Sequence, residues 1–78
     1  MKIEKEMPEN LSAEEFYEDY IQDNDVFSGM PDEGWEYTRK HAGEVYDEAL
    51  TIRGDEWQAA EAAVRRVLHR HGMDGESW

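Results

Sequence analysis

The sequence predicts a small all-α fold, a compact array of three main helices with one short additional helical turn. Apolar residues recur three and four positions apart along three stretches of the chain, which is the period of a helix with one buried face. Capping residues precede two of these stretches, and glycines follow two of them. No stretch shows the two-residue alternation that is typical of a half-buried strand.

The first helix is expected over Ala13–Gln22. Ser12 and Glu15 form a capping-box pattern, in which the serine hydroxyl accepts from the glutamate amide and the glutamate side chain reaches back to the serine amide. Phe16 and Tyr20 are four residues apart, so they are expected to share the buried face. The opposite face of this helix is acidic.

Two further helices are expected, over Thr38–Arg53 and Glu56–His71. Pro31 suits the first position of a helix, so a short helical turn over Asp32–Tyr37 is expected before the first of them. Gly54 and Gly72 supply the stops, and Asp55 with Gln58 caps the last helix. The apolar faces of these two helices predict a core that contains Tyr46, Leu50, Trp57, Val64 and Leu68.

A chain of 78 residues makes one domain with a small core. Residues 1–10 are expected to form a flexible acidic lead, residues 11–72 a single helical domain, and residues 73–78 a tail. The first residues lack the apolar core of a secretory signal, and no apolar run approaches the roughly 20 residues that span a bilayer. A cytoplasmic protein without a membrane span is therefore expected.

The net charge of −12 and the absence of cysteine exclude several classes of function. Direct binding to nucleic-acid phosphates needs clustered lysine and arginine, and an anionic membrane surface would repel this chain. Disulfides and zinc–thiolate sites need cysteine. A basic protein surface, by contrast, would attract the chain over long range.

The acidic residues are concentrated in the N-terminal half. Residues 1–36 contain twelve acidic residues and two lysines, whereas residues 37–78 contain eight acidic residues and six lysines or arginines. A continuous acidic strip that binds a basic protein surface is predicted from Glu14, Glu15, Glu18, Asp19, Asp23, Asp25, Asp32, Glu33 and Glu36. Trp35 and Tyr37 are candidate aromatic anchors beside it. Two plainer interpretations are that the strip only solvates the protein and that Trp35 packs inward.

The inventory of side chains favours neither catalysis nor a metal site. His69 and His71 would point about 200° apart on a helix, so they cannot share a metal ion. His41 lies on the apolar face of its helix, where packing is the expected role. A calcium loop that starts at Asp23 fails because its fifth position is Phe27. No nucleophile has a recognisable base and orienting group, so a non-enzymatic protein without a cofactor is expected.

The C-terminal part of the chain resembles the ChaB-like family in two blocks. The matching positions are Met30, Pro31, His41, Ala42, Glu44, Val45, Tyr46, Ala49 and Leu50 in the first block, and Ala60, Ala62, Ala63, Val64, Arg65 and Arg66 in the second. The family's second Leu-Pro is Thr38-Arg39 here, and its tryptophan is Glu61. ChaB-like proteins are described as regulators of cation transport, and no catalytic residues belong to the pattern. The resemblance implies a helical regulatory domain with residues 1–29 as an added segment.

The sequence thus predicts a small acidic, ChaB-like regulatory or interaction protein that binds a basic protein surface. The alternative is a nucleic-acid mimic of the phage type, which blocks a nucleic-acid-binding protein as anti-restriction and anti-CRISPR proteins do. A mimic needs carboxylates in rows on one exposed face. Neither the identity of the partner nor the oligomeric state follows from the sequence.

Overall fold

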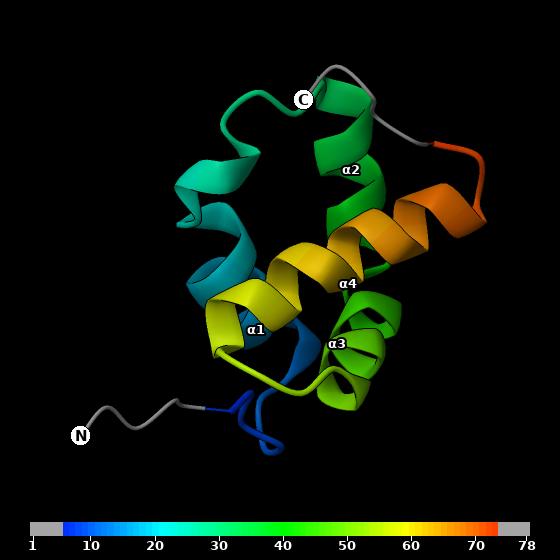
Figure 1. Cartoon of the computed structure of the whole chain (residues 1–78). Helices are drawn as coiled ribbons and strands as arrows, with labels where there is room; N and C mark the ends of the chain where they lie inside the picture. The colour runs from blue at the N-terminus through cyan, green and yellow to red at the C-terminus, as the bar shows by residue number, and fades with distance from the viewer. Residues whose placement is uncertain (1–5, 74–78) are drawn as a thin grey trace.

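The computed structural model describes residues 6–73, and all the regular structure within them is helical (Figure 1). The elements are α1 (Ala13–Phe16), the π-helix η1 (Tyr17–Gln22), the 3₁₀ turn η2 (Asp25–Phe27), α2 (Asp32–Lys40), α3 (Ala42–Thr51) and α4 (Glu56–Arg70). The all-α class is confirmed. The expected count of three main helices and one short turn is corrected, because the described residues form four α-helices and two shorter helical types.

The first helix covers the predicted residues but changes its pitch along the way. The capping box is confirmed, since the Glu15 amide donates to Ser12 Oγ and the Ser12 amide donates to Glu15 Oε1, each at 3.1 Å. After Phe16 the helix widens into η1, whose hydrogen bonds reach one residue further than those of an α-helix. The fully buried residues are therefore Phe16 and Ile21, five positions apart, while Tyr20 is partly buried.

The prediction of one helix over Thr38–Arg53 is wrong, because the chain bends at His41. This residue has φ −112° and ψ 33°, outside the helical range, so α2 ends at Lys40 and α3 begins at Ala42. The expected short turn over Asp32–Tyr37 is the first part of the nine-residue α2. The bend sends α2 and α3 away from each other at an angle, and both pack against α4, which crosses the middle of the view in Figure 1.

The core lies where α3 and α4 meet the first helix. Its buried residues are Met7, Phe16, Ile21, Phe27, Met30, Val45, Tyr46, Ala49, Ala59, Ala60, Ala63, Val64, Val67 and Leu68. The predicted burial of Tyr46, Val64 and Leu68 is confirmed. Phe16 of α1 joins the two halves of the chain, because its ring lies 5.0 Å from the ring of Tyr46 on α3.

Two of the predicted core residues are exposed, Leu50 to 38% and Trp57 to 39%. Leu50 follows Ala49 on α3 and lies at the edge of the buried face of that helix. Trp57 lies in the first turn of α4, at the end of the core, where it packs against Tyr20 with ring centroids 5.0 Å apart. A residue with the right helical angle is therefore still exposed when it sits at the end or edge of the packed surface.

The segment before α1 is held against α3 by the hydroxyl of Tyr46. This hydroxyl accepts a hydrogen bond from the Leu11 amide at 3.0 Å and donates one to the Pro8 carbonyl. Met7 is buried, so part of the segment expected to be a flexible lead packs against the core. Met73, from the expected tail, also packs there. Residues 1–5 and 74–78 of these two segments lie outside the described residues.

Candidate interaction surface

Two of the three acidic residues of α3, Glu44 and Glu48, are paired with cationic side chains at the C-terminal end of α4. Glu48 accepts from Arg66 Nη1 at 3.2 Å and from Arg70 Nη2 at 2.8 Å. Glu44 Oε2 lies 3.2 Å from Arg70 Nη1 and 3.0 Å from His71 Nε2. This network joins the two helices across their exposed edge, and it neutralises part of the charge of the C-terminal half.

The same contacts shift the ionisation of both carboxylates. Hydrogen bonds from Arg70 and Arg66 hold the pKa of Glu48 below its ordinary value. The hydrogen bond with His71 is the main cause that lowers the pKa of Glu44. The hydrogen bond to Glu48 raises the pKa of Arg70 in return. Solvent screens these side chains, so their contribution to the free energy of unfolding is small.

The predicted acidic strip differs from this network in both exposure and pairing. All nine of its carboxylates belong to exposed residues, and within residues 6–73 none of them has an ion-pair partner. Glu15 has a local role, because its carboxylate caps the first helix through the Ser12 amide. The other eight carboxylates are free to meet an outside partner.

The structure brings the strip residues together in two groups. Glu14 and Glu18 line a groove beside the first helix. Asp32, Glu33 and Glu36 of α2 line a separate hollow of about 330 Å³, together with Tyr37, Lys40, His41 and Met73. The strip residues Glu15, Asp19, Asp23 and Asp25 line neither of these two hollows. Two of the nine strip residues therefore line the groove, and three line the hollow of α2.

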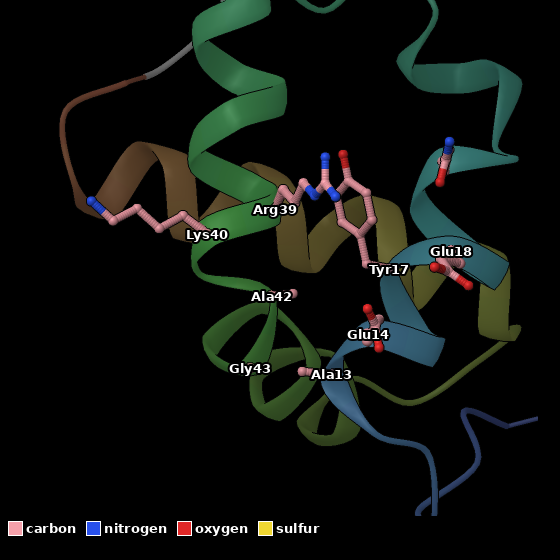
Figure 2. Close-up of a pocket in the computed structure, with 9 residues that line it drawn as sticks. Ala13, Glu14, Tyr17, Glu18, Arg39, Lys40, Ala42 and Gly43 are labelled. Atoms are coloured by element: carbon pink, nitrogen blue, oxygen red, sulfur yellow. The ribbon is translucent and has the colours of Figure 1, made fainter.

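The groove lies between the first helix and the bend that joins α2 to α3 (Figure 2). It has a volume of about 540 Å³ and is lined by Ala13, Glu14, Tyr17, Glu18, Gln22, Arg39, Lys40, Ala42 and Gly43. In Figure 2, Arg39 reaches from α2 toward the ring of Tyr17, while Lys40 points to the other side of α2. Burial raises the pKa of Tyr17, and the charge of Arg39 partly offsets this rise.

The two candidate aromatic anchors have different environments. The ring of Trp35 meets those of Tyr17 and Phe27 edge-on, with centroids 6.5 Å and 6.3 Å away, so Trp35 packs inward and is partly buried. Tyr37 stacks on His41 at 4.3 Å and borders the acidic hollow of α2. Both side chains are partly buried, and Tyr37 is the one that lines a hollow together with carboxylates.

Two of the three histidines, His41 and His71, take part in ring contacts. His41 stacks on Tyr37 and lies 6.2 Å from the ring of His71, which contacts Glu44. Among residues 6–73, no three histidine or acidic side chains are grouped so that they could hold a metal ion. In the same part of the chain, no helix has the length and apolar character needed to cross a membrane.

Reasoning from the sequence missed the network between α3 and α4 and the position of Arg39. A signal for the network was present, since Glu44 and Glu48 are four residues apart, as are Arg66 and Arg70. The groove had no such signal, because it brings together residues of α1–η1 and residues around a bend that lie at least seventeen positions later in the sequence.

Comparisons with protein families, with curated proteins and with solved structures found no match for this chain. Many of the residues that match the ChaB-like pattern have a structural role, because they are buried where helices pack together. These buried positions are Ala42, Val45, Tyr46 and Ala49 on α3, and Ala60, Ala63 and Val64 on α4. Helix packing is therefore enough to account for these residues, and membership of the family stays a prediction.

Proposed function

We propose that this chain is a non-enzymatic regulatory or interaction protein of the cytoplasm, which binds a basic surface of another protein through its acidic N-terminal half. One observation carries the proposal: eight carboxylates of the strip are exposed and unpaired, whereas Glu44 and Glu48 are each paired with α4. The ChaB-like resemblance supports a regulatory role and contributes no site residues.

Unpaired like charges on so small a protein repel one another and gain no ion-pair energy in return. A basic partner surface removes this repulsion when it binds. It also attracts the acidic half before contact, over a distance of about 8 Å at physiological ionic strength. Tyr37 supports the proposal as an aromatic contact beside Asp32, Glu33 and Glu36.

Affinity capture from the cells that make this protein tests the proposal with three forms of the chain. The first is the wild type. The second is a strip variant, Glu14→Gln, Glu18→Gln, Asp23→Asn and Asp25→Asn. The third is a control variant with the same change in charge on α3 and α4, Glu44→Gln, Asp47→Asn, Glu48→Gln and Glu61→Gln.

The wild type and the control variant are expected to retain the same protein, one with a basic surface, and the strip variant is expected to lose it. Equal recovery by all three forms would show that the strip only solvates the chain. Changing Tyr37→Ala in the wild type is expected to weaken the same interaction.

A nucleic-acid mimic is the second candidate, and one arrangement favours it. Glu14 and Glu18, and likewise Glu15 and Asp19, are four residues apart and form two short rows of exposed carboxylates along the first helix. If the captured protein binds DNA or RNA and nucleic acid displaces this chain, mimicry is supported. If nucleic acid does not compete, the regulatory interaction is supported.

A further inference from the structure

We propose that the groove between the first helix and the α2–α3 bend binds one peptide segment of the partner. This segment presents a lysine or arginine to Glu14 and Glu18, and it presents hydrogen-bond acceptors, from a carboxylate or from main-chain carbonyls, to Arg39. The inference rests on the proposed function, because it names the part of the acidic half where a specific contact is made.

The groove holds opposite charges that are not paired with each other. Glu14 and Glu18 stand on the first helix and Arg39 stands on α2, and within residues 6–73 none of the three takes part in an ion pair or a side-chain hydrogen bond. On α3 and α4 the same residue types are paired at 2.8–3.2 Å. The charges in the groove therefore keep their full capacity to bind a ligand that carries both a donor and an acceptor group.

Gly43, the second residue of α3, lines the groove without a side chain of its own. At Gly34 the fold explains the glycine, since a Cβ there would lie 2.7 Å from Met30 Cγ. At Gly43 a Cβ would meet the Ala13 Cβ at 4.0 Å, which is an ordinary contact. A methyl group therefore has room at this position, whereas a longer side chain would extend into the groove.

The lining indicates a peptide as the occupant. Ala13, Ala42 and Gly43 are small, so a main chain can approach the two helices closely at this point. The planar guanidinium of Arg39 offers several donors in one plane, which suits carboxylates and successive carbonyl groups. Two carboxylates on the facing side suit one cationic side chain. The volume of about 540 Å³ lies within the range of roughly 300–1,000 Å³ that is typical of ligand sites.

Nuclear magnetic resonance of the ¹⁵N-labelled protein tests the inference without knowledge of the partner. The probe is a short blocked peptide in which alanines separate one arginine from one aspartate. The matched control peptide carries glutamine and asparagine at the two charged positions. Amide shifts are expected at Tyr17, Ala42 and Gly43 with the charged peptide, and not with the control peptide.

Two substitutions make the test specific. Gly43→Gln fills the base of the groove without a change in charge, and it is expected to raise the dissociation constant of the peptide by about tenfold or more. Gly43→Ala adds a methyl group for which there is room, and it is expected to bind as the wild type does. Circular dichroism of both variants verifies that the helices are retained.

Shifts spread evenly over all the exposed acidic residues, or no shifts at all, would overturn the inference. So would equal binding by Gly43→Gln and Gly43→Ala. The proposed function fails in a different way, by equal capture of a basic protein with the strip variant and the wild type. A groove that does not bind peptide would leave that capture result unchanged, so the two failures are distinguishable.

Discussion

Glu44 and Glu48 of α3 are paired with cationic side chains, whereas the strip carboxylates of the N-terminal half are not paired within residues 6–73. Glu48 contacts Arg66 and Arg70 across the surface between α3 and α4. Glu18, in the π-helix η1, is exposed and has no ion-pair partner within the described residues. The tertiary packing places two arginines of α4 within ion-pair distance of Glu48, whereas Arg39, which lines the same groove as Glu18, forms no ion pair with it.

A paired carboxylate has its charge balanced inside the molecule, whereas an unpaired, exposed carboxylate contributes little to folding and remains available for association. In this chain Glu44 and Glu48 of the second half are paired, and the nine strip carboxylates of the first half have no ion-pair partner within residues 6–73. The proposed function assigns recognition to the unpaired group.

The largest expected effect tests whether the acidic half is part of one cooperative domain. Phe16 is fully buried and its ring lies 5.0 Å from that of Tyr46, so it connects the first helix to α3. Phe16→Ala is expected to lower the free energy of unfolding by about 3–5 kcal/mol, the usual cost of removing a buried phenylalanine. Urea unfolding followed by circular dichroism and by tryptophan fluorescence measures it.

The two probes are expected to give one coincident transition for Phe16→Ala. A separate transition for α3 and α4, or a loss below about 1 kcal/mol, would show that the first helix is an appendage. The two halves would then be independent units, and the comparison between them would lose its basis.

A smaller effect on stability is expected at Thr38, where the unpaired polar group is buried and not exposed as in the acidic strip. The hydroxyl of Thr38 on α2 is fully buried and has no hydrogen-bond partner among the described residues. Thr38→Val keeps the shape of the side chain and removes the hydroxyl, so it is expected to stabilise the protein by about 1 kcal/mol. The control is Thr51→Val, which is expected not to stabilise, because the exposed Thr51 hydroxyl donates to the Glu48 carbonyl at 2.7 Å. A destabilised Thr38→Val would contradict this interpretation of Thr38.

The smallest expected effect concerns the dependence of stability on pH. The pKa values of Glu44 and Glu48 lie below the ordinary value of 4.5, through their contacts with His71, Arg70 and Arg66. Their stabilising contribution is therefore fully present above pH 4.5 and is lost as the pH falls through the lowered values. The double variant Glu44→Gln and Glu48→Gln is expected to be slightly less stable at pH 7 and to lose less stability on acidification than the wild type. Thermal unfolding at a series of pH values checks this, and parallel curves for the two proteins would contradict it.

Much of the fold followed from local signals in the sequence. The capping box of Ser12 and Glu15 marked the start of the first helix. Asp55 marked the start of α4, where its side chain accepts from the Trp57 amide at 3.1 Å. Gly72, with φ 74°, follows the end of α4 as predicted. These signals are readable because each depends on residues a few positions apart.

The features that could not be predicted depend on residues far apart in the sequence. The bend at His41 occurs without a proline there, because α2 and α3 pack against different parts of the core. Leu50 and Trp57 are exposed because they lie at the edge or end of the surface where α3 and α4 pack against the core, and the extent of that surface depends on the tertiary structure. The pairing of the acidic residues is of the same kind, since the composition gives the charge of each half but not which carboxylates meet an arginine.

The association rate with the captured basic protein, measured over a range of salt concentrations, tests the separation of the two kinds of carboxylate most directly. The wild type and the control variant on α3 and α4 are expected to associate rapidly at low salt and to slow steeply as salt rises. The strip variant is expected to associate slowly at low salt, with a weak dependence on salt. A strip variant that associates as fast as the wild type, with the same dependence on salt, would contradict the account.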